Sequence, residues 1–157
     1  SSDLVLGALQ AAREAGALTV GLTSNAGTPL ALQAEHALVL DTGAELVSGS
    51  TRLKAGTAQK IALNTLSTAL MVRLHKVYGN LMVDVQATNQ KLVERSKRIV
   101  GEASGSPRDA AERALAAANG EVKTAIVMLK CAIDATAARA RLAQHAGSVR
   151  RALESNA

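Results

Sequence analysis

The segment 45–60 contains residue types that could bind a phosphorylated ligand. Ser48, Ser50 and Thr51 offer three hydroxyl groups, and Gly49 lets backbone N–H groups approach an anion. A helix is expected to begin a few residues later, and the amino end of a helix favours negative charge. The segment therefore predicts a phosphate site. The alternative is that Ser50 or Thr51 only caps the helix.

Charged residues of the same segment extend this prediction. Arg52 and Lys54 add positive charge beside the hydroxyl groups. Glu45 is a carboxylate that could act as a general base or bind sugar hydroxyls, and its alternative is a solvated side chain. Glu45 is accordingly a candidate catalytic residue, and Lys54 is a candidate ligand-binding residue.

Two short apolar runs predict buried strands that would hold this segment, and each follows a stretch with helical character. In chain order these helices and strands are expected at 4–15, 18–22, 29–35 and 36–40. Gly16 can end the first helix and Pro29 can begin the second. The alternation predicts a parallel α/β sheet, in which ligands bind beyond the carboxyl ends of the strands.

The rest of the chain is expected to be helical. One long helix should end at Gly79-Asn80, and the next should begin at a cap at Asp84 or Thr88. The expected ranges are 56–77, about 84–100, 108–118, 121–133, 135–144 and 147–153. The segment 101–107 predicts a domain boundary between residues 1–100 and a small helical bundle at 101–157.

Composition restricts the function classes. Hydrophobic residues make up 48% and charged residues 20%, which is typical of a globular chain. The net charge of +5 arises from basic residues interleaved with acidic ones, which indicates solvated helix faces. The near absence of aromatic residues argues against binding of single-stranded nucleic acid, and no apolar run is long enough for a membrane span.

Cysteine and histidine offer no further chemistry. The single cysteine, Cys131, excludes an intrachain disulfide and is expected to be buried, and His75 is expected at the surface. No cluster of histidine, cysteine and carboxylate residues has the spacing of a metal site.

The number of expected strands is small for a doubly wound sheet. Such sheets have about five or six strands, and two are expected here. The sequence therefore predicts that the chain begins within an α/β domain.

Three runs of residues resemble the bacterial N-acetylmuramic acid 6-phosphate etherase family. They are SGSTRLKAGTAQK at 48–60, KVYGNLMVDVQATNQKL at 76–92 and GEVKTAIVMLK at 120–130. The chain resembles the C-terminal half of the proteins in that family. The animal glucokinase regulatory protein is similar to a lesser degree. The resemblance implies the later part of an αβα, flavodoxin-like sugar isomerase domain, followed by a small bundle of the ubiquitin-associated type.

The resemblance also implies an activity. The family is a cytoplasmic carbon–oxygen lyase that removes D-lactate from N-acetylmuramic acid 6-phosphate and leaves N-acetylglucosamine 6-phosphate. It works as a homodimer without metal or organic cofactor. Abstraction of the C2 proton next to an aldehyde fits this chemistry. The family's two catalytic glutamates are expected to precede Ser1, so the chain alone is expected to lack activity.

The substrate-holding residues implied by the resemblance fall within the chain. Ser48 and Ser50 match serines that face the sugar phosphate. Asn89 and Lys91 match a motif at a ligand mouth, either of the same subunit or of the partner subunit. The alternative for Lys91 is a solvated helix lysine. The alternative for the whole protein is a non-catalytic domain that binds a phosphosugar and regulates a partner.

Overall fold

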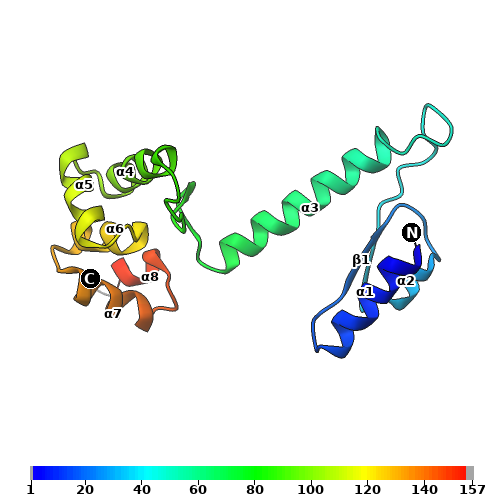
Figure 1. Ribbon diagram of the computed structural model, residues 1–157, viewed down its shortest axis with the longest axis horizontal. Coiled ribbons are helices and arrows are strands. Elements are labelled where there is room, and N and C mark those ends of the chain that lie inside the picture. The colour runs from blue at the N-terminus through cyan, green and yellow to red at the C-terminus, as the bar shows by residue number, and fades with distance from the viewer. Residues whose placement is uncertain (1, 155–157) are drawn as a thin grey trace. The chain divides into compact units, whose positions relative to one another are not determined.

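The computed structural model describes residues 2–154, which form two compact units, one up to Ser67 and one from Thr68 onward (Figure 1). Helices make up most of the described residues, and a parallel pair of strands lies in the first unit. This confirms the expected mostly helical chain with part of an α/β architecture. The flavodoxin-like sugar isomerase domain stays a prediction.

The first unit is built around strands β1 (Val20–Thr23) and β2 (His36–Val39). The strands are parallel, with Val20 opposite His36 and Thr23 opposite Val39. Helix α1 (Ser2–Glu14) precedes β1, and the short helix α2 (Pro29–Gln33) joins the two strands. The expected order of helix, strand, helix and strand is confirmed.

Helix α2 packs closely on β1 because Gly21 has no side chain. A Cβ atom added at Gly21 would lie 2.8 Å from the Ala34 Cβ and 2.9 Å from the Leu30 carbonyl oxygen. Thr28 caps α2, since its Oγ1 accepts a hydrogen bond from the Ala31 N–H at 3.3 Å. This cap lets the chain leave β1, form one short helix and return to β2.

The expectation that both strands are buried is wrong. In β1 only Gly21 is buried, and all four residues of β2 are exposed. The reason is that, among the described elements, only α2 packs extensively against the two strands. A short helix leaves most of their surface open.

Helix α3 (Lys54–Arg73) ends earlier than expected, and a β-hairpin follows it. His75 has a φ of 56°, so the backbone leaves the helix in the left-handed conformation. Strands β3 (Val77–Tyr78) and β4 (Leu81–Met82) then pair antiparallel around Gly79-Asn80. The described residues thus contain four strands, and the prediction of a helix as far as residue 77 is wrong.

Asn89 is the N-cap of helix α4 (Gln90–Ser104), so the expected caps at Asp84 and Thr88 are wrong. The Asn89 Oδ1 accepts a hydrogen bond from the Leu92 N–H at 2.9 Å. Gly105, with a φ of 71°, ends the helix four residues later than expected.

The C-terminal helices agree with the sequence prediction. They are α5 (Arg108–Ala117), α6 (Val122–Cys131), α7 (Ala135–Gln144) and α8 (Val149–Glu154). Helix α6 packs against α4, α5, α7 and α8. The buried core around it consists of Val83, Ile99, Val100, Ala111, Ala114, Leu115, Ala118, Val122, Ala125, Ile126, Val127, Ala138, Leu142, Val149 and Ala152.

The second unit continues from α4 into the C-terminal helices. Helix α4 packs against α5 and α6 within the compact unit that begins at Thr68. The domain boundary expected at 101–107 stays a prediction. The expectation that Cys131 is buried is wrong, because it is partly exposed where it packs against the edge of the core. His75, expected at the surface, is partly exposed.

Candidate functional site

The loops that follow β1 and β2 meet at the carboxyl edge of the strand pair and enclose a hollow of about 370 Å³. This is the edge at which parallel α/β sheets bind ligands. We call it the strand-edge hollow. Its lining consists of Ser24, Asn25, Asp41, Thr42, Gly43, Ala44, Glu45, Ser48, Gly49, Thr51 and Ala55.

Hydroxyl and amide groups dominate this lining. The Ser24 Oγ is buried and has no hydrogen-bond partner among the described residues. The Asp41 Oδ1 accepts a hydrogen bond from the Gly43 N–H at 3.2 Å, which fixes the loop after β2. Such a hollow can hydrogen-bond the hydroxyl groups of a sugar or the oxygens of a phosphate.

Glu45 is bound to the start of α3. Its Oε2 accepts a hydrogen bond from the Lys54 N–H and its Oε1 accepts one from the Ala55 N–H, both at 3.1 Å. The Lys54 ammonium donates to the Ala44 carbonyl oxygen at 2.7 Å. The carboxylate therefore caps the helix, and the side chain remains partly exposed to solvent.

The amino end of α3 is consequently occupied. After Lys54 and Ala55, the Gly56 N–H donates to the Thr51 carbonyl oxygen at 3.0 Å, and the Thr57 N–H donates to the Leu53 carbonyl oxygen at 3.3 Å. A helix leaves its first four N–H groups without partners inside the helix, and here all four have acceptors. The anion-binding helix end expected from the sequence is filled by the protein itself.

The candidates from the sequence fall into three groups. Glu45, Ser48 and Thr51 line the strand-edge hollow, whereas Ser50 and Lys54 are not part of its lining. The Ser50 N–H instead donates to the Val47 carbonyl oxygen at 3.0 Å, which makes a turn inside the loop. The third group, Asn89 and Lys91, belongs to the second unit.

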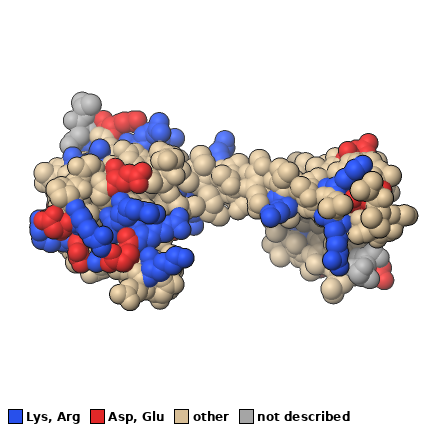
Figure 2. Space-filling model, turned by 90° about the horizontal axis from the view of Figure 1, so that it is seen from above, with Lys and Arg blue, Asp and Glu red and all other residues tan. Residues whose placement is uncertain are grey.

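Asn89 and Lys91 line a groove along α4 that has a volume of about 800 Å³. The other lining residues are Leu92, Glu94, Arg95, Lys97, Arg98 and Arg108. Figure 2 shows Lys and Arg side chains interspersed with acidic ones over the surface of this helical unit. Five cations against one carboxylate make the lining of the groove basic.

Some of these cations are neutralised by neighbouring carboxylates. Lys97 pairs with Glu112 at 2.7 Å and with Glu94 at 3.0 Å, and Glu94 also binds Arg108. The carboxylate of Glu112, followed by that of Glu94, raises the pKa of Lys97 above its ordinary value. Within the described part of the chain, Lys91, Arg95 and Arg98 lack ion-pair partners. These three cations are therefore available to bind an anionic ligand.

Four polar residues of the strand-edge hollow were missed by the sequence reasoning, namely Ser24, Asn25, Asp41 and Thr42. Their signal was their position, because each lies within three residues of the end of a strand. The rule that ligands bind beyond the carboxyl ends of parallel strands would have selected them.

Residues 2–154 provide neither a metal site nor a membrane span through their own side chains and helices. They contain no group of three or more histidine, cysteine or carboxylate residues arranged to hold a metal ion. None of their helices combines the length and the apolar character needed to cross a bilayer.

Comparison with known proteins identifies relatives over nearly the whole chain. An N-acetylmuramic acid 6-phosphate etherase of Deinococcus radiodurans is 59% identical over 153 residues, which is 98% of this chain and 50% of that protein. Etherases of Streptomyces coelicolor and Aeromonas hydrophila are 55% and 54% identical over 94% and 92% of the chain.

The matches cover 48% and 49% of these two relatives, so the chain spans about half their length. No protein-family model matches the chain. At such identity over almost every residue, the chain is a homologue of the N-acetylmuramic acid 6-phosphate etherases and corresponds to about half of such a protein.

Proposed function

We propose that this chain supplies the substrate-holding part of an N-acetylmuramic acid 6-phosphate etherase. In the complete protein, this lyase would release D-lactate and leave N-acetylglucosamine 6-phosphate. The observation that carries the proposal is the 59% identity to an etherase over 98% of the chain. The strand-edge hollow supports it, because its hydroxyl-rich loops suit a phosphorylated sugar.

Two separate sets of residues are proposed to bind ligand. Ser48 and Thr51 would face the ligand in the strand-edge hollow, with Ser50 and Lys54 shaping the same loop. Asn89 and Lys91 line the separate groove on α4, where Lys91 is an exposed cation, and are proposed to bind ligand there. Catalytic glutamates would come from the half of such an etherase to which this chain does not correspond.

A homodimer and a cytoplasmic location are part of this proposal. Large apolar side chains are exposed along residues 4–74, and they include Leu63, Leu66 and Leu70 on α3. Such a surface favours a partner or further protein segments. Sedimentation of a full-length protein is expected to give twice the monomer mass, and a monomer would contradict the dimer.

The enzyme proposal is tested with a chimera in which this chain replaces the matching half of the Deinococcus radiodurans relative. The chimera is expected to release D-lactate from N-acetylmuramic acid 6-phosphate, whereas the 157-residue chain alone is expected to release none. A properly folded chimera without activity would contradict the proposal. Lactate release by the purified chain alone would contradict the assignment of catalysis to the other half.

A binding-only, regulatory role is the second candidate. The observation that favours it is the engagement of Glu45, since both its oxygens already accept backbone hydrogen bonds. A chimera that binds N-acetylglucosamine 6-phosphate but releases no lactate would support this candidate over the enzyme.

A further inference from the structure

Glu45 joins the two ends of the loop that carries the candidate hydroxyl groups. Its carboxylate binds the N–H groups of Lys54 and Ala55 at 3.1 Å each. Between Glu45 and Lys54 the chain turns through Ser48, Ser50 and Thr51. One side chain therefore closes this loop at its base.

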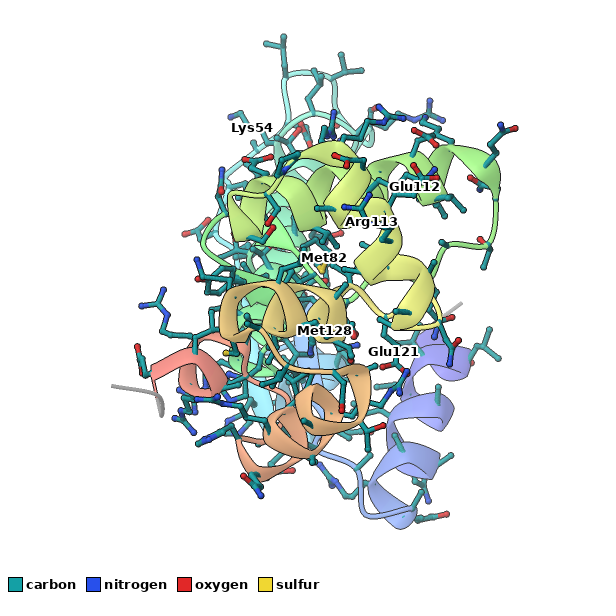
Figure 3. All side chains as sticks on the ribbon, turned by 90° about the vertical axis from the view of Figure 1, so that its left-hand side faces the viewer. Lys54, Met82, Glu112, Arg113, Glu121 and Met128 are labelled. Carbon is teal, nitrogen blue, oxygen red and sulfur yellow. The ribbon has the colours of Figure 1, made fainter. Side chains whose placement is uncertain are left out.

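Lys54 adds a third bond to the same closure. Its ammonium group donates to the Ala44 carbonyl oxygen at 2.7 Å, next to Glu45 in the chain. Figure 3 labels Lys54, which lies at the start of α3. We call these three hydrogen bonds the Glu45 clamp.

We propose that Glu45 is a positioning residue, which holds the hydroxyl-bearing loop in the shape that binds a phosphosugar, and does not transfer a proton. This inference rests on the proposed function, because that function supplies the ligand. A general base must reach the proton that it removes. Both Glu45 oxygens are directed at backbone N–H groups of α3, and this fixes the carboxylate as part of the loop frame.

The clamp also determines which groups meet the phosphate. The N–H groups of residues 54–57 all have acceptors within the protein. The phosphate is therefore bound by the loop, through Ser48 and Thr51, and not by the helix end. A phosphate at the helix end would have to displace a carboxylate that is held by two hydrogen bonds.

The first test compares Glu45→Gln with the unaltered 157-residue chain by NMR. Glutamine keeps the size of the side chain but replaces one acceptor oxygen with an NH₂ group, which cannot accept from a backbone N–H. We expect exchange of the Lys54 and Ala55 amide hydrogens to accelerate about tenfold, the effect of losing a helix cap. Unchanged exchange would overturn the clamp.

The second test measures binding of N-acetylglucosamine 6-phosphate to the same chains by NMR titration. A loop released from its frame should bind about tenfold more weakly. A catalytic base would leave this affinity unchanged. Faster amide exchange with an unchanged dissociation constant would therefore overturn the positioning role.

Two further variants separate this effect from general damage. Glu35→Gln makes the same chemical change at an exposed site of the same unit, and it should alter neither measurement. Glu45→Asp keeps the negative charge on a shorter side chain and should recover part of both amide protection and affinity. If Glu45→Gln unfolds the unit, Glu45→Asp is compared with the unaltered chain in its place. Unchanged amide exchange together with an unchanged dissociation constant in Glu45→Asp would then overturn the inference.

Failure of the proposed function has a different signature. If the unaltered chain does not bind the phosphosugar, the proposed function fails, together with the ligand-related part of this inference. The amide exchange of Lys54 and Ala55 still decides whether the clamp exists, because it requires no ligand.

Discussion

At the scale of single residues, two serines of α4 differ in whether their hydroxyl group has a partner. Ser96 is fully buried, and its Oγ lacks a hydrogen bond within the described residues. Ser104 is partly buried, and its Oγ donates to the Val100 carbonyl oxygen at 2.7 Å. A buried hydroxyl without a partner costs free energy, whereas a bonded one does not.

Replacing Ser96 by alanine should therefore stabilise the second unit. Ser96→Ala is expected to raise the free energy of unfolding by about 1 kcal/mol, because it removes an unpaired buried hydroxyl and favours the helix. Urea denaturation measures the change. Ser104→Ala, the matched control, is expected to gain nothing because it loses a hydrogen bond, and equal gains in the two variants would contradict this account.

Glu121 gives the second unit a dependence on acid. Its Oε2 accepts hydrogen bonds from the Thr124 hydroxyl at 2.7 Å and from the Arg139 Nε at 2.8 Å. The Thr124 hydrogen bond and then Arg139 lower the pKa of Glu121 below its ordinary value of 4.5. Figure 3 labels Glu121, which is the residue directly before α6.

The melting temperature should consequently fall as the pH drops below about 4.5. The contribution of Glu121 is complete above its unfolded pKa and is lost as the pH falls through its lower folded pKa. Glu121→Gln should reduce this acid-induced drop, as measured by circular dichroism between pH 6 and 3 at intervals of about half a unit. Glu102→Gln, at an exposed position of α4, is the control, and equal drops in both variants would exclude Glu121 as the cause.

At the scale of elements, residues with positive φ end several helices. Gly16 and Gly105 do so without a side chain, whereas His75 and Ala132 hold the left-handed conformation with one. Ala132 has a φ of 54° and follows α6, where the Ile133 N–H donates to the Met128 carbonyl oxygen at 3.3 Å. An L-residue in this conformation costs about 1 kcal/mol or more.

Ala132→Gly is therefore expected to stabilise the protein by about 0.5–1 kcal/mol, because glycine adopts this conformation without steric cost. Urea denaturation again measures the change. Ala116→Gly, inside α5 at another exposed position, should instead lower stability by about 1 kcal/mol. Destabilisation of similar size in both variants would show that the left-handed conformation of Ala132 carries no cost.

At the scale of the whole molecule, burial is distributed unevenly along the chain. The core cluster lies entirely between Val83 and Ala152, whereas the exposed large hydrophobic residues lie between Leu4 and Leu74. The second unit therefore contains its own hydrophobic core. The first unit and the first residues of the second leave large apolar side chains exposed.

A fragment comprising residues 76–157 should consequently fold by itself. It is expected to unfold cooperatively, because it contains every residue of the core cluster. Calorimetry tests this, and Ile126→Ala should lower its stability by about 3 kcal/mol, since Ile126 is fully buried. A fragment that melts without a cooperative transition would show that the first unit is needed for folding.

The sequence by itself determined most of the local structure. Helices α5–α8 lie within a few residues of their expected positions because glycine, asparagine and apolar periodicity act over a few neighbouring residues. The runs at 48–60 and 76–92 also identified the relatives, which match over nearly all of the chain and about half of their own length. The hairpin at 77–82 was missed because its strands are two residues each, too short for a period to show.

Only the tertiary structure decided which groups meet. Sequence separates Glu45 from the N–H groups of Lys54 and Ala55 by nine and ten residues, and no spacing rule predicts that the carboxylate caps α3. Sequence also separates Ser24 from Asp41, which share the strand-edge hollow because parallel pairing of β1 and β2 brings their carboxyl ends together. Contacts across such separations arise from packing between elements, and packing is not encoded in any single stretch of the chain.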